Sequence, residues 1–164
     1  MIAFGIDPGS RRTGWGVVQA EGSRMIHLGS GVIRATESEA LPLRLHTIHR
    51  ELEEVLQERR PDHVFVESVF HSKSAKSALV LGQARGVALL AAAQGGYPIV
   101  EITPAEVKKA VTGSGRAEKL QVQEMVKVLL GLKTRAPSDA SDALALAIAG
   151  TAVLRWKVAT GAAR

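Results

Sequence analysis

The sequence predicts an α/β fold in which a mixed five-stranded sheet, with three antiparallel and two parallel strands, carries helices on both faces. Two observations indicate this fold: three strand-like apolar runs follow one another near the start, and strand-like and helix-like segments alternate after them. With 164 residues, 46% of them apolar, the chain is long enough for one sizeable core. We therefore expect a single domain over residues 1–158 and a short flexible tail at 159–164.

The first half of the chain predicts a meander and one crossover. Turn-forming residues at 8–10 and 21–23 separate three apolar runs, which predicts antiparallel strands at 2–7, 14–20 and 25–34. Apolar residues then recur at helical spacing over 41–60, and Pro61 ends this helix. If the helix is a right-handed crossover, the next strand, at 63–67, lies parallel to strand 2–7.

The second half predicts one more parallel strand among four helices. An Ala/Leu-rich helix at 75–94 is followed by two glycines and a strand at 98–102. The Thr-Pro-Ala-Glu signature at 103–106 is a capping box, so a helix starts there and ends near Gly113. Two more helices are expected at 118–130 and 138–156, and residues from Thr160 onward are expected to fray.

Four carboxylates stand where this fold could gather them. Asp7 and Glu67 end two parallel strands at the carboxyl edge, where open α/β sheets bind ligands, and Asp139 and Asp142 share one face of a helix start. Oxygen ligands suit Mg²⁺ or Mn²⁺, and two such ions about 3.5–4 Å apart can clamp both oxygens of a phosphoryl displacement. Singly, each acid has a plainer interpretation, because Asp is common in Pro-Gly turns and acids in a first helical turn offset the helix dipole.

The charge of the chain favours a polyanionic partner. The net charge is +5, and the segment from Thr103 to Arg135 alone holds seven basic residues against three acids. Arg116 and the lysines of this segment would neutralise the phosphates of such a partner, although a solvated helical face is an equally simple interpretation of the lysines. There is no cysteine, signal peptide or apolar run of about 20 residues, so we expect a cytoplasmic protein without a membrane segment.

Seven short motifs are spread over nearly the whole chain. They are Gly-Ile-Asp-Pro-Gly at 5–9, Thr-Gly-Trp-Gly at 13–16, Glu-Ser-Val-Phe at 67–70, Leu-Gly-Gln-Ala-Arg-Gly-Val at 81–87, Pro-Ala-Glu-Val-Lys at 104–108, Ala-Glu-Lys at 117–119 and Ser-Asp-Ala-Ser-Asp-Ala-Leu at 138–144. Together they resemble the RuvC-type Holliday junction resolvases of the ribonuclease H-like superfamily. The motif at 5–9 is shared loosely across that superfamily, whereas the motif at 81–87 is far more specific.

The resemblance implies an activity, a set of site residues and partners. It implies a homodimer that nicks symmetric strands of a four-way junction, uses magnesium, leaves 5′-phosphate and 3′-hydroxyl ends, and cooperates with the RuvAB branch-migration complex. The metal-binding catalytic acids would be Asp7, Glu67, Asp139 and Asp142. Lys108 and Lys119 would approach the scissile phosphate, Phe70 would stack on an unpaired base, and Lys73 and Lys76 would contact backbone phosphates beside it.

Two other classes of protein remain as alternatives. An actin-like ATPase or sugar kinase also opens with a strand and an Asp-x-Gly loop, but it needs two lobes to enclose ATP and this chain has the length of one. A junction-binding regulator without activity would keep the fold, but it has no need for all four acids.

Overall fold

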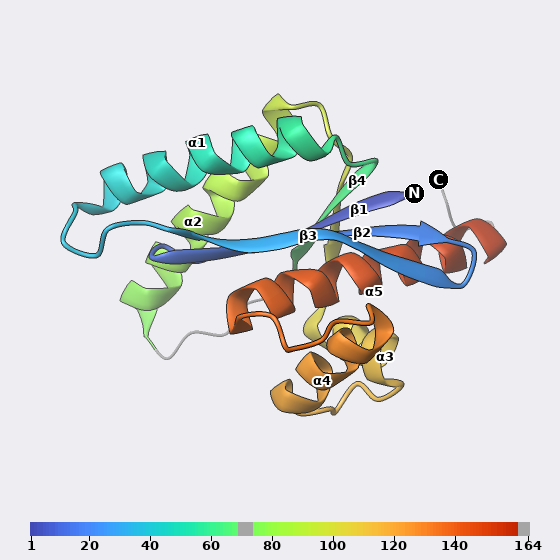
Figure 1. The fold of residues 1–164 in the computed structure, drawn as a ribbon. Coiled ribbons are helices and arrows are strands. Elements are labelled where there is room, and N and C mark those ends of the chain that lie inside the picture. The colour runs from blue at the N-terminus through green and yellow to red at the C-terminus, as the bar shows by residue number, and fades with distance from the viewer. Residues whose placement is uncertain (69–73, 161–164) are drawn as a thin grey trace.

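A computed structural model describes residues 1–68 and 74–160, and its five-stranded sheet confirms the predicted mixed topology (Figure 1). The strand order is β3-β2-β1-β4-β5. The first three strands form the antiparallel meander, and β4 and β5 run parallel to β1. Their bounds are β1 Ile2–Asp7, β2 Arg12–Glu21, β3 Arg24–Arg34, β4 His63–Glu67 and β5 Ile99–Ile102.

Helices cover both faces of this sheet, as the sequence predicts (Figure 1). One apolar core joins the sheet to α1 and α2, and a second core joins the opposite face to α3, α4 and α5. None of the helices in the described ranges is long and apolar enough to cross a membrane. The helices are α1 Leu41–Arg59, α2 Ala75–Gln94, α3 Pro104–Thr112, α4 Lys119–Leu129 and α5 Ser138–Thr160.

Two element boundaries differ from the sequence prediction by more than one residue. β2 begins at Arg12 and not at residue 14, because Arg12 pairs with Arg34 and Thr13 with Ile33 across the meander. α5 continues through Thr160 and does not end at Trp156. No Gly or Pro interrupts residues 157–160, so the backbone hydrogen bonds of the helix continue.

Glycines in β1 and β2 let α5 lie directly on the sheet. A Cβ atom added to Gly14 would stand 2.0 Å from the backbone oxygen of Asp139, and one added to Gly5 would stand 1.9 Å from that of Ala143. A Cβ atom added to Gly16 would likewise stand 2.7 Å from Cγ of Leu144. Any side chain at these positions would push α5 away from the strands, so the glycines set how closely the helix start approaches β1 and β2.

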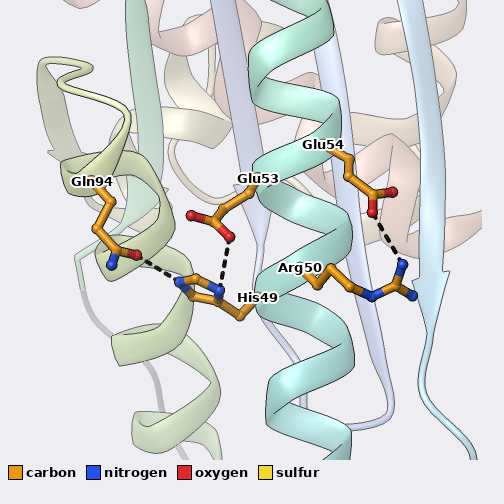
Figure 2. Close-up of polar contacts among 5 residues, drawn as sticks. All are labelled: His49, Arg50, Glu53, Glu54 and Gln94. Atoms are coloured by element: carbon orange, nitrogen blue, oxygen red, sulfur yellow. Dashed lines mark hydrogen bonds and ion pairs between the residues drawn. The ribbon is translucent and has the colours of Figure 1, made fainter.

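On the opposite face, polar contacts join α1 to α2 (Figure 2). Nε2 of His49 lies 2.7 Å from Oε1 of Gln94, and Nδ1 of the same ring lies 3.2 Å from Oε2 of Glu53. Arg50 and Glu54 form a separate ion pair within α1 at 3.0 Å. These contacts lie on the α1 and α2 side of the sheet, away from the start of α5.

Candidate active site

Two of the predicted acids lie side by side at the carboxyl edge of the sheet. Ile6 pairs with Val66 on the parallel strands β1 and β4, so the next residues, Asp7 and Glu67, are neighbours where both strands end. Strand side chains alternate between faces, and Gly5 faces α5, so Asp7 points toward that helix as well. Both acids line one cavity of about 350 Å³.

The start of α5 brings the third acid into this cavity. Asp142 is a lining residue together with Ala145 and Leu146, which follow it on the same helix. Asp139 lies one turn earlier and does not line the cavity. Its charge nevertheless raises the pKa of both Asp7 and Asp142, so it lies within electrostatic reach of the site.

Burial and crowding of like charges perturb Asp7 most strongly. Burial is the main cause that raises its pKa to about 7, and the charges of Asp142, Asp139 and Glu67 raise it further against the opposing charge of Lys119. The pKa of Asp142 is also raised, mainly by burial, although its hydrogen bond with Lys119 acts in the other direction. The cavity therefore stabilises a positive charge placed among these carboxylates.

Two lysines also line the cavity. Nζ of Lys119 donates a 2.5 Å hydrogen bond to Oδ2 of Asp142, and Lys108 approaches from α3. Burial alone would lower the pKa of Lys119, but the bond to Asp142 and the nearby acids outweigh it and raise the pKa. Lys119 therefore stays protonated, and the cavity presents cations beside acids.

The donor set fits a hard divalent cation. Carboxylate oxygens from two strand ends and a helix start are the ligands that Mg²⁺ and Mn²⁺ prefer. The raised pKa of Asp7 reflects burial of its charge and repulsion by the other acids, and a bound cation would offset both. Within residues 1–68 and 74–160, no three acidic or histidine side chains are already arranged tightly enough to form a metal centre. Asp142 is instead paired with Lys119.

The turn after Asp7 is fixed by a buried threonine. The hydroxyl of Thr13 donates to the carbonyl of Gly9 at 2.9 Å and accepts from the Gly9 amide at 3.3 Å. Thr13 is fully buried, so these bonds are shielded from water. The short connection between β1 and β2 therefore holds the backbone that follows Asp7.

The other expected DNA-binding residues lie outside this cavity. Lys76 lines a different cavity of about 380 Å³ together with Arg11 and Arg44, and Arg116 lines a third, of about 460 Å³, between α3 and α4. Phe70 and Lys73 lie outside the described residues. Arg11 and Arg44 were not predicted, because no local pattern in the sequence shows that a turn residue and an α1 residue will meet the start of α2.

Strand order, helix placement and the acidic edge together define a ribonuclease H-like fold. Solved structures of similar proteins share it. One, described as Thermus thermophilus RuvC in complex with a Holliday junction substrate, is 36% identical, covers 95% of this chain and 96% of its own, and superimposes with a TM-score of 0.89. The yeast mitochondrial Holliday junction resolvase Ydc2 shares the fold at 14% identity, with a TM-score of 0.65 and coverage of 94% of this chain and 82% of its own.

Sequence comparisons identify the family. The family described as Crossover junction endodeoxyribonuclease RuvC matches residues 3–150. A protein of that name from Citrifermentans bemidjiense is 52% identical over 148 residues, which are 90% of each chain. Another from Geobacter sulfurreducens is 48% identical over 157 residues, or 94% of this chain and 96% of the other. The chain belongs to the RuvC family, which confirms the resemblance seen in its motifs.

Proposed function

We propose that this protein is a structure-selective endonuclease that resolves four-way (Holliday) DNA junctions by paired symmetric nicks during recombination and DNA repair. The observation that carries the proposal is a cavity in a RuvC family member where Asp7, Glu67 and Asp142 face Lys108 and Lys119. Acids that attract metal, next to lysines that attract phosphate, are the arrangement that phosphodiester hydrolysis needs.

The four acids would hold two Mg²⁺ ions, with Mn²⁺ as a substitute. Asp7 and Glu67 would bind from the strand edge, and Asp139 and Asp142 from the start of α5. When bound, the metal supplies Lewis-acid stabilisation of the phosphate and a more acidic water. Water attacks phosphorus, the bond to the 3′ oxygen breaks, and the products are a 5′-phosphate and a 3′-hydroxyl end.

The lysines of the cavity would hold the phosphate that is cut. Lys108 and Lys119 would each bind a non-bridging oxygen of the scissile phosphate, which carries more negative charge as water attacks. For Lys119 this requires its bond to Asp142 to be exchanged for one to DNA when metal binds the carboxylate. Asp7 must lose its proton to bind metal, so the affinity for metal should increase as the pH rises toward about 7.

Basic residues on either side of the cavity would bind the junction arms. Lys76, Arg11 and Arg44 surround a second cavity, and Arg116 lies near a third. Lys73 would add another phosphate contact, and the Phe70 ring would stack on a base freed at the crossover. Such contacts depend on the charge and shape of the DNA backbone. Because they neutralise phosphates, the affinity for the junction should fall steeply as the salt concentration rises.

Paired cuts require two copies of the site, so we propose a homodimer. α2 exposes Leu79 and Leu90, with 65% and 50% of their surface accessible, and Gly86 lies on the same face between them. Residues spaced by seven and eleven share one side of a helix, so this stripe suits contact with a second copy. The protein would act on DNA together with the RuvAB branch-migration complex. It would do so in the cytoplasm.

A synthetic four-way junction tests the function directly. We expect Mg²⁺-dependent nicks at symmetric positions on two opposing strands, a linear duplex left intact, and nicks that a ligase can seal. Asp7→Asn should bind the junction and not cut it. Absence of metal-dependent nicking by the unmutated protein, under conditions where it binds the junction, would contradict the proposal and favour a non-catalytic regulator.

A further inference from the structure

Arg85 links the end of β4 to β5. It lies on α2 within the Gly-Gln-Ala-Arg-Gly motif of residues 82–86. Its Nε–H donates to the backbone carbonyl of Glu67 at 3.1 Å, and Nη2–H donates to Oε2 of Glu101 at 2.5 Å. The side chain is only 18% exposed, so the guanidinium lies mostly within the protein. One arginine thus connects three elements beside the acidic cavity.

The sheet itself provides no donor for the carbonyl that Arg85 binds. The amides of Val64 and Ser68 donate toward β5. Because backbone groups alternate in direction along a strand, those of the odd-numbered residues of β4, including the Glu67 carbonyl, face β1. Ile6 pairs with Val66, so residue 8 would stand opposite Ser68. In a parallel ladder, the amide that would donate to the Glu67 carbonyl from the β1 side is therefore that of residue 8. That residue is Pro8, which has no N–H.

We infer that Arg85 is a positioning residue for the metal site: it replaces the missing strand donor at Glu67, and Glu101 holds its guanidinium in place. The inference rests on the proposed function, because its effect on metal passes through the Glu67 carboxylate. The carboxylate points to the α5 face, whereas Arg85 approaches the backbone from the α2 side. Arg85 therefore orients Glu67 without lining the cavity.

The geometry distinguishes Arg85 from a lysine at the same position. Arginine presents its Nε and Nη donors in a fixed fork, so one side chain satisfies a backbone carbonyl and a carboxylate at once. Lysine has a single flexible donor group and can satisfy only one of the two well. Arg85→Lys should therefore restore part of the function that Arg85→Gln removes, and Glu101→Gln should have a weaker effect in the same direction.

The experiment compares Arg85→Gln, Arg85→Lys and Glu101→Gln with the unmutated protein, and uses Arg50→Gln as a matched control. Arg50 is an exposed arginine whose ion pairs, among the residues that the structure describes, all lie within α1. Two readouts need no DNA: Mn²⁺ binding by calorimetry, and the hydrogen-exchange rate of the Ser68 amide, which donates to Ile102 at the end of β4. Junction affinity without metal and single-turnover cleavage complete the set.

For Arg85→Gln we expect Mn²⁺ affinity and cleavage rate to fall by about 10–100-fold, as is typical when a group that orients a metal ligand is lost. Exchange at Ser68 should accelerate by about tenfold, and junction affinity should stay within about twofold. Arg50→Gln should change none of these. Thermal unfolding identifies a variant that has lost its fold, in which case Arg85→Lys and Glu101→Gln provide the test.

Two results would overturn the inference. Unchanged Mn²⁺ affinity and Ser68 exchange in the Arg85 variants would show that Glu67 needs no such support. Weakened junction binding with unchanged Mn²⁺ affinity would show that Arg85 contacts DNA instead. If the unmutated protein binds no Mn²⁺, the proposed function fails, and Ser68 exchange alone still decides whether Arg85 holds the end of β4.

Discussion

Replacing Asp7 with asparagine should abolish cleavage and yet stabilise the metal-free protein. Asp7 has a pKa of about 7 in the folded chain, against 3.8 for an unperturbed aspartate carboxyl, because burial and neighbouring acids disfavour its charge. Asparagine occupies nearly the same volume and carries no charge. The variant therefore removes the repulsion together with the metal ligand.

The pH dependence of this effect has a definite sign. A carboxyl whose pKa is raised on folding keeps its proton in the folded protein while the unfolded chain releases it. Its contribution to stability is therefore fully present below about pH 4 and is lost as the pH rises through about 7. This rise in the pKa of Asp7 from 3.8 to about 7 corresponds to at most about 4 kcal/mol.

We expect Asp7→Asn to gain about half of this maximum free energy of unfolding at pH 8. The gain is smaller than the maximum because the asparagine amide, unlike the carboxylate, is not attracted to the charge of Lys119. A gain of about 2 kcal/mol corresponds to a rise in Tm of about 4–8 °C for a protein of this size. The assay is thermal unfolding of both proteins in EDTA between pH 4 and pH 8, repeated with added Mg²⁺. The gain should shrink toward pH 4, and Mg²⁺ should stabilise only the unmutated protein appreciably.

The reasoning would be refuted if Asp7→Asn were less stable than the unmutated protein at pH 8, or stabilised equally at pH 4 and pH 8. Either result would show that the charge of Asp7 does not destabilise the folded protein. Cleavage by Asp7→Asn near the unmutated rate would remove this residue from the proposed metal site. Junction binding measured in EDTA should be retained, and it provides the control for a correctly folded DNA-binding surface.

Three further predictions follow from the site and its supports. Lys119→Met should raise the pKa of Asp7 above about 7, because the lysine charge lowers it; carboxyl NMR titration of the metal-free protein measures this, and an unchanged or lower value would contradict it. Gly14→Ala should destabilise the fold by about 1–3 kcal/mol and impair cleavage by displacing α5, whereas Gly86→Ala, with open space around it, should be neutral or stabilising in urea unfolding. Phe70→Ala should slow cleavage of intact junctions more than it weakens their binding, and equal activity would indicate a packing residue.

Much of the fold could be predicted because its signals are local. The capping box of Thr103 and Glu106 forms as the sequence indicates, with the threonine hydroxyl accepting from the Glu106 amide. Gly113 adopts φ 81° and ends α3, a conformation that favours glycine. Each signal acts within a few residues of its own position, so the sequence alone suffices to place it. The far end of α5 was predicted four residues too early, at Trp156 instead of Thr160.

The site was only partly predictable because its supports depend on packing. Strand ends and a helix start could be recognised as places where Asp7, Glu67 and Asp142 would meet. Nothing local to Arg85 indicates that its guanidinium will reach a carbonyl 18 residues earlier in the chain. The missing donor at Pro8 becomes apparent only when β4 lies beside β1, so the need for Arg85 arises from two segments that are distant in the sequence.

The acidic cavity and the glycine contacts depend on each other physically. Acids crowded at the sheet edge repel, and α5 brings two of them, so electrostatics alone would push the helix start away from β1. Packing opposes this, because Gly5, Gly14 and Gly16 allow α5 to bury Ala143 and Leu144 completely against the strands. Close packing along the middle of α5 therefore holds its charged start in a position that the acids alone would not adopt. The start of α5 therefore keeps its acids in position to bind a cation, because the rest of the helix cannot move without exposing its buried apolar residues.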